Sequence, residues 1–150
     1  MVVLFNLLLN GEMEKTVTSI VILFLWVVYS ILEGMREGYY YDAAVRANKS
    51  YPNIHWIYFL QRGIFLFIVG IYMNSIILPM SLIFIFSYIH DGAYYCQRND
   101  IDVKTYPRRF KDHSTTSTAF FELHYMERVA FALTGCVFFI AYLFLINISI

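Results

Sequence analysis

The residues that could bind a metal stand close to the ends of long apolar stretches. Three of the four histidines, His55, His90 and His124, are placed in this way, and Glu33 and Glu122 occupy similar positions. Imidazole together with carboxylate suits zinc, iron or manganese. However, the chain contains neither Glu-x-x-His nor His-Glu-x-x-His, and its two cysteines are far apart in sequence. A metal site, or a haem held by His55 and His90, is therefore a hypothesis that the sequence does not favour, and the cofactor is unknown.

Proton transfer is a second chemistry that the sequence could support, because a histidine and an aspartate are adjacent at His90-Asp91. Neighbouring residues on a helix diverge by about 100°, so we predict that these two do not form a relay with each other. Either could act with a group from another helix. No nucleophile motif such as Gly-x-Ser-x-Gly accompanies them, and catalytic residues are therefore unknown.

Arg62 is the charged residue placed deepest in an apolar stretch. It lies about two helical turns inside, where an ionised side chain costs at least roughly 2.5–3.5 kcal/mol on membrane-insertion scales. Such a charge needs a partner, and we predict an ion pair between Glu33 and Arg62, with Gln61 or Tyr58 close by. The alternative is that the arginine extends along the helix to reach the lipid headgroups.

A basic cluster precedes a run of hydroxyl residues in the segment 106–118. Arg108, Arg109 and Lys111, with backbone amides at a helix start, could bind a phosphate or a lipid headgroup. A simpler interpretation is that the basic residues set membrane topology and that Ser117 or Thr118 caps the next helix. We favour the simpler one, because the segment has no glycine-rich phosphate loop.

The elements that must position these residues are membrane-spanning helices. Hydrophobic residues make up 59% and charged residues 15% of the 150 residues, against roughly 45–50% and 25% in soluble domains. Apolar runs predict four spans at about 17–32, 56–73, 78–96 and 129–146, with Asn74-Ser75 and Pro79 supplying a tight hairpin between the second and the third. Helices are expected because backbone groups facing lipid must satisfy one another.

The predicted fold is thus all-α, a single transmembrane domain over residues 1–150 that forms an up-down-up-down four-helix bundle. The first helix is expected to continue through residues 33–47 and to end near Asn48-Lys49, although Gly34 and Gly38 weaken that prediction. The fourth helix is likewise expected to begin before the membrane, at Ser117 or Thr118. The first ten residues are too short to span and are interpreted as an interfacial segment, unless translation starts naturally at Met13.

Small residues predict where helices approach one another closely. Gly63 and Gly70 share one face of the second helix, and Ala132 shares a face of the fourth with Gly135 or Cys136.

Orientation follows from the basic residues. Nine lie in or beside the two polar connections, 33–55 and 97–128, and only Lys15 lies on the other side. This asymmetry predicts that both connections are cytoplasmic and that both termini lie on the opposite side, most simply in a bacterial-type inner membrane. The formal net charge is zero, which gives no reason to expect a nucleic-acid partner.

With this topology the ends of all four helices meet at one membrane face, where the polar side chains should collect. The candidates for a polar cluster are Glu33, Glu37, Tyr40, His55, Gln61, Arg62, His90, Asp91, Tyr94, Arg98, Glu122 and His124. A non-enzymatic subunit or a module that binds a partner or ligand through this cluster is the favoured function, the partner being another protein or a second copy of the chain. A membrane-embedded, metal-dependent enzyme is the alternative. A homo-oligomeric pore is least favoured, because the other halves of the spans lack polar stripes.

Overall fold

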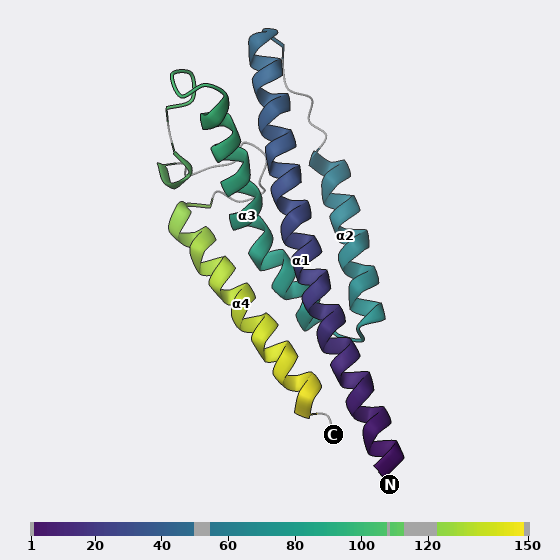
Figure 1. Cartoon of the computed structure of the whole chain (residues 1–150). Coiled ribbons are helices and arrows are strands. Elements are labelled where there is room, and N and C mark those ends of the chain that lie inside the picture. Colours follow the sequence, from purple (N-terminus) through teal and green to yellow (C-terminus); the bar gives the residue numbers. More distant parts are fainter. Residues whose placement is uncertain (1, 50–54, 108, 113–122, 149–150) are drawn as a thin grey trace.

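Four α-helices make up most of the part of the chain that the structure describes (Figure 1). The computed structural model describes residues 2–49, 55–107, 109–112 and 123–148, without the side chains of residues 2–10, 12 and 55. The helices are α1 (Val2–Arg46), α2 (His55–Tyr72), α3 (Ile77–Ile101) and α4 (Tyr125–Ile148), and a short 3-10 helix, η1, spans Phe110–Asp112. None of the residues just given lies in a strand, so the predicted all-α class is confirmed.

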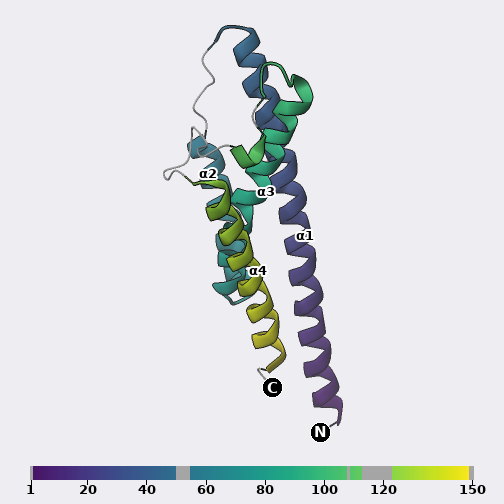
Figure 2. The same ribbon diagram turned by 90° about the vertical axis from the view of Figure 1, so that its left-hand side faces the viewer.

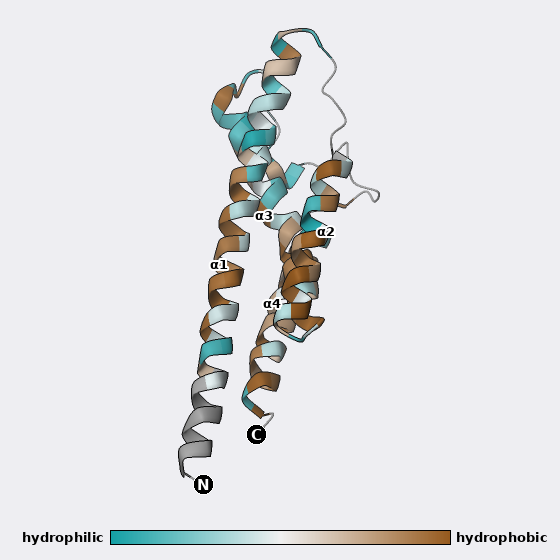
Figure 3. Cartoon of the chain, turned by 90° about the vertical axis from the view of Figure 1, so that its right-hand side faces the viewer, coloured by the Kyte–Doolittle hydropathy of each residue, from teal (hydrophilic) through white to brown (hydrophobic). Residues whose placement is uncertain are grey.

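Three of these helices are long and apolar enough to cross a membrane. They are Met13–Arg46 of α1, Ile77–Ile101 and Tyr125–Ile148, whereas the apolar part of α2, Trp56–Tyr72, is shorter. Apolar residues form a band over the middle of the molecule, and polar residues gather at its upper end (Figure 3). Large apolar side chains stand exposed along α2 and α4, where a bilayer would cover them. These features indicate an integral membrane protein.

The helices alternate in direction as predicted, but α3 lies at the centre of the assembly. Both α1 and α4 pack mainly against α3, while α1 and α4 touch each other over a short stretch only. The backbone of α2 comes near α3 and stays away from α1, so α2 is a peripheral helix (Figure 2). The arrangement therefore differs from a four-helix bundle in which every helix packs equally on two neighbours.

Glycines set the close approach of α3 to its two main neighbours. A Cβ atom on Gly34 would overlap the carbonyl group of His90, and one on Gly38 would lie 3.1 Å from the side chain of Gln97. On the other side of α3, a Cβ on Gly135 would lie 2.7 Å from the carbonyl oxygen of Ser81. The predicted contact at Gly135 is confirmed, whereas Gly63 faces open space and the prediction for it was wrong.

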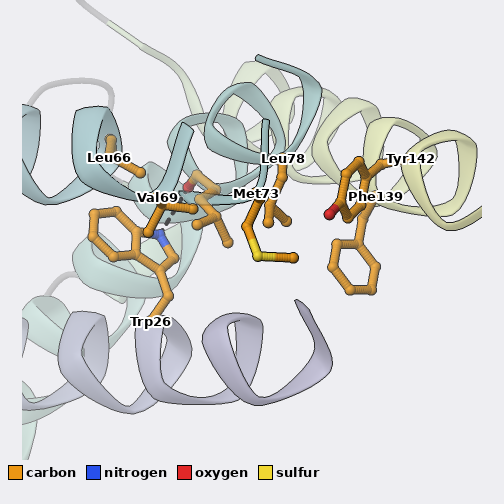
Figure 4. Packing of buried hydrophobic residues seen from close by; sticks show 8 residues of the cluster. Trp26, Leu66, Val69, Met73, Leu78, Phe139 and Tyr142 are labelled. Atoms are coloured by element: carbon orange, nitrogen blue, oxygen red, sulfur yellow. Dashed lines mark hydrogen bonds between the residues drawn. The ribbon is translucent and has the colours of Figure 1, made fainter. Parts of the chain in front are cut away.

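The apolar core lies in the half of the molecule that contains the hairpin between α2 and α3. Trp26 is its centre, because its Nε1 donates to the carbonyl of Leu82 over 2.8 Å and its ring stacks on Phe65 at 5.3 Å. Figure 4 shows Trp26 of α1 enclosed by residues of the other helices. The buried members of this core are Trp26, Leu66, Val69, Met73, Leu78, Leu82, Phe139 and Tyr142.

Two asparagines end helices at the predicted places. Asn48 and Asn74 have positive φ values of 52° and 48°, the left-handed conformation that terminates a helix. After α1, the amide of Lys49 donates to Ala44, and after α2, the amide of Ser75 donates to Gly70, so both ends form Schellman motifs.

The predicted start of the fourth helix was wrong. Leu123 and His124 are not helical, and α4 begins at Tyr125, where the carboxylate of Glu127 accepts the His124 amide at 2.7 Å. A side chain can thus cap the helix from inside its first turn. The caps proposed at Ser117 or Thr118 lie outside the described residues. At the other end of the chain, α1 begins at Val2, so residues 2–10 continue the first helix without a break.

Candidate functional site

Six charged or titratable side chains from four helices meet at the polar end. Glu33 and Glu37 lie one turn apart on the face of α1 that packs on α3, beside Gly34 and Gly38. The close helix contact that these glycines allow therefore buries the two acids as well. The set, called the charged cluster below, consists of Glu33 and Glu37 of α1, Arg62 of α2, His90 and Asp91 of α3, and Arg128 of α4.

The predicted ion pair between Glu33 and Arg62 is confirmed. The Nη2 atom of Arg62 donates to Oε1 of Glu33 over 3.0 Å, and Glu33 is only 3% exposed. The guanidinium of Arg62 also lies 4.2 Å above the ring of Phe86, so that it contacts an aromatic face and a carboxylate together. Tyr58 packs under Arg36 instead, at 4.8 Å, and Gln61 is exposed.

His90 lies between two carboxylates. Its Nδ1 atom is 3.0 Å from Oδ1 of Asp91, and its Nε2 atom is 3.6 Å from Oε2 of Glu37 on α1. The two neighbours do contact each other, although the sequence predicted that they do not form a relay. The angle of about 100° separates the directions in which side chains leave the backbone, but it does not fix the positions of their tips. The imidazole lies against Phe86, with ring centres 4.8 Å apart, and this places Nδ1 within reach of its neighbour.

Asp91 continues the row of charges to α4. Its Oδ2 atom lies 3.2 Å from Nε of Arg128, which is 1% exposed. Phe110 of η1 covers this arginine, with the guanidinium 5.6 Å from the ring centre, and also packs on Tyr125 of α4. The sequence placed Arg128 at the polar end without a partner, and it gave no signal for Phe110.

A separate aromatic group surrounds Arg98 nearer the end of α1. Its guanidinium lies 4.2 Å from the ring of Tyr41 and 4.4 Å from that of Tyr106, and it donates to the hydroxyl of Tyr94. Tyr106 also donates to Asp42 over 3.0 Å, which ties the turn after α3 to α1. Burial raises the pKa of Tyr106 most, and the hydrogen bond to this carboxylate raises it further. Tyr94 and Arg98 thus belong to a structural group apart from the charged cluster.

The remaining candidates whose side chains the structure describes do not join the charged cluster. Tyr40 and His124 are exposed, as are Arg109 and Lys111 of the basic segment. The side chains of His55, Glu122 and Arg108 lie outside the described residues.

A metal site finds no support in the part of the chain that the structure describes. Among those residues, no group of three or more histidine, cysteine, aspartate or glutamate side chains is placed to hold a metal ion. Both ring nitrogens of His90 face carboxylates, with Nδ1 within hydrogen-bond distance of Asp91 and Nε2 at an ion-pair distance from Glu37, a geometry that suits charge pairing more than metal ligation. The chemistry that the charged cluster supports directly is the pairing of buried charges between helices.

Comparison with known proteins adds no relative. No protein-family model matches the chain, and no curated protein or solved structure resembles it significantly.

Proposed function

We propose that this protein is a non-enzymatic polytopic membrane protein that acts as a subunit or a partner-binding module through its polar end. One observation carries the proposal: the buried charges are paired between helices. The Glu33–Arg62 pair links α1 to α2, and the Asp91–Arg128 pair links α3 to α4. A catalytic group must be reached by its substrate, whereas these acids and Arg128 are buried. The charged cluster therefore fits a structural role, in which ion pairs between helices stabilise the surface that they form.

The surface that the charged cluster stabilises is the polar end itself. Tyr40, Arg109, Lys111 and His124 are exposed there, next to the rigid frame of α1, α3 and η1. The excess of basic residues at this end supports a cytoplasmic orientation, with both termini on the other side of the membrane. A partner would then approach from the cytoplasm, and a second copy of the chain is one such partner.

Photo-cross-linking in native membranes tests this proposal. A photoreactive amino acid replaces Tyr40 or Lys111 at the polar end, and Ile140, exposed on α4, serves as the matched control in the lipid-facing band. We expect one defined protein, or a second copy, to cross-link from the polar end in stoichiometric yield, and only lipid from Ile140. Cross-linking of no protein from either polar position would contradict a partner-binding role.

A membrane-embedded enzyme is the second candidate, and the surroundings of His90 favour it. An imidazole with carboxylates on both ring nitrogens resembles the paired groups that general acid–base catalysis uses. Metal analysis and an absorption spectrum of the purified protein test the metal-dependent version. Stoichiometric metal that is lost in a folded His90→Gln variant would replace the first proposal with this one.

A further inference from the structure

The tip of the hairpin between α2 and α3 can be placed against the other helices by their register. Two contacts show that α1 and α3 run in parallel. Trp26 of α1 bonds to Leu82 of α3, and the same number of residues further along each helix, Gly34 lies beside His90. The tip, residues 74–76, is therefore level with residues 18–20 of α1. The hydroxyl of Ser19 lies 3.2 Å from that of Tyr142, so the tip is also level with Tyr142 of α4.

This register makes the hairpin shorter than the neighbouring spans. Between Arg128 and Ile148, α4 rises about 30 Å, which matches the hydrocarbon core of a bilayer. Between His90, at the depth of Arg128, and Ile77, α3 rises only about 20 Å. The tip thus ends about 10 Å nearer the charged cluster than α4 does. Figures 1 and 2 both show it stopping short of the two chain termini.

Several backbone amides at the tip bond within the turn, which lowers the cost of placing it in lipid. The amides of Asn74 and Ser75 donate to carbonyl groups in the last turn of α2, at 3.1 and 3.0 Å. At the start of α3, the Ser75 hydroxyl accepts the Ile77 amide at 3.2 Å, and the Met80 amide bonds within the helix. Pro79 has no amide hydrogen at all.

Apart from Asn74 and Ser75 in the turn itself, the side chains around the tip are apolar, and several of them are exposed. No charged residue occurs from residue 63 to residue 89. Ile76 at the tip itself is 77% exposed. An open groove of about 560 Å³ runs between α2 and α3 beside the tip, with Phe67, Ile71, Met80 and Ile83 among its lining residues. Exposure of an apolar surface of this kind costs free energy in water but not in hydrocarbon.

We propose that the α2–α3 hairpin is re-entrant, with its tip inside the leaflet farther from the charged cluster, and that its groove binds an acyl chain of a phospholipid from that leaflet. The depth of the tip selects this occupant, because acyl chains fill the space between the tip and the membrane surface. The inference does not depend on the proposed function.

Thiol labelling in sealed proteoliposomes tests the depth. Single cysteines replace Ile76 at the tip, Asn147 at the end of α4 or Lys49 after α1, with Cys96 and Cys136 changed to alanine. A membrane-impermeant maleimide reaches only the outside of the vesicles. It should therefore label Asn147→Cys and Lys49→Cys in those molecules whose orientation places that cysteine on the outside. Ile76→Cys should stay unlabelled in both orientations and should become labelled once SDS has dissolved the membrane. Labelling of Ile76→Cys at the rate of Asn147→Cys would overturn the proposal.

Photoactivatable phosphatidylcholine with a diazirine on its acyl chain tests the occupant. We expect lipid adducts at Phe67 and Met80 in several-fold higher yield than at Ile140, which is about as exposed as Phe67 and more exposed than Met80 but lies outside the groove. A Gly70→Leu variant, which fills the groove, should remove this excess. Equal yields at the three residues, or efficient disulfide formation between two copies of a Phe67→Cys variant, would show that the groove does not select an acyl chain.

Discussion

The guanidinium group of Arg128 is almost completely buried. Transfer of such a group into a low-dielectric site is compensated only if a counter-charge with good geometry is present. Asp91 supplies that charge at 3.2 Å, and the ring of Phe110 covers the guanidinium. Arg36 shows the contrast, because its side chain is 44% exposed and lies 4.0 Å from Glu33, where solvent weakens the interaction. Burial, more than the number of charges, decides which pairs matter.

Removal of Arg128 should therefore destabilise the protein strongly. An Arg128→Met variant leaves the Asp91 carboxylate buried without its guanidinium partner, and we expect a loss of about 3–5 kcal/mol in the free energy of unfolding. Titration with SDS in mixed micelles, followed by circular dichroism, measures this loss. Arg109→Met, at an exposed site, is the matched control and should change stability by less than about 0.5 kcal/mol. Equal stability of the two variants would show that the buried pair contributes nothing.

Asp102 provides a test of electrostatics outside the membrane. The Thr105 hydroxyl and the backbone amides of Thr105 and Lys104 donate to its carboxylate and lower the pKa of Asp102. A carboxyl whose pKa is lowered by folding stabilises the native turn above its unfolded value of about 3.9, and this stabilisation is lost as the pH falls through the folded pKa.

The amide chemical shifts of Lys104 and Thr105 should accordingly titrate with a midpoint below about 3.9. Nuclear magnetic resonance of the protein in detergent micelles measures them. In an Asp102→Asn variant this transition should disappear. A midpoint at or above the ordinary aspartate value would contradict the hydrogen-bonded turn.

At the scale of elements, local sequence signals predicted helix ends better than helix contacts. Asn48 and Asn74 end helices through their own tolerance of positive φ, which depends on neighbouring residues only. Gly34 and Gly38 lower the helix propensity of α1, yet they allow α3 to approach. A glycine's cost in helix propensity is local, whereas its benefit depends on which helix packs against it, and a single sequence does not contain that information. The same limit explains the wrong prediction for Gly63.

Two alanine substitutions separate these effects. Gly34→Ala would force its methyl group into the carbonyl of His90, and we expect a loss of about 1–3 kcal/mol in the free energy of unfolding as α1 and α3 move apart. Gly63→Ala enters open space and should stabilise α2 by about 0.5–1 kcal/mol through helix propensity alone. Both values come from unfolding in SDS. A stabilising Gly34→Ala would mean that the two helices do not pack as closely as described.

For the whole molecule, the sequence predicted which residues face the polar end but not which helix occupies the centre. The Glu33–Arg62 pair followed from depth alone, since a charge two turns inside a span needs a partner at the same level. The central place of α3 did not follow, because four apolar helices of similar composition do not reveal their neighbours. The row from Glu37 through His90 and Asp91 to Arg128 depends on that central place.

The peripheral position of α2 gives the Glu33–Arg62 pair a role in the whole assembly. The backbone of α2 does not approach α1, so long side chains alone connect them, notably this pair and the Trp26–Phe65 stack. An Arg62→Glu variant places two carboxylates together and should release α2 from α1. The exchanged double variant, Glu33→Arg with Arg62→Glu, should restore the contact, because it rebuilds the pair with the charges reversed.

Distances between spin labels on Ile68 of α2 and Ile140 of α4 measure this release. We expect a broad distribution shifted to longer distances in Arg62→Glu and a narrow one in the exchanged variant. Arg36→Glu, which alters an exposed arginine near the same glutamate, should leave the distribution unchanged. If Arg62 simply extended to the headgroups, both single variants would behave alike. A difference between them therefore identifies the buried pair as the link that holds α2 to α1.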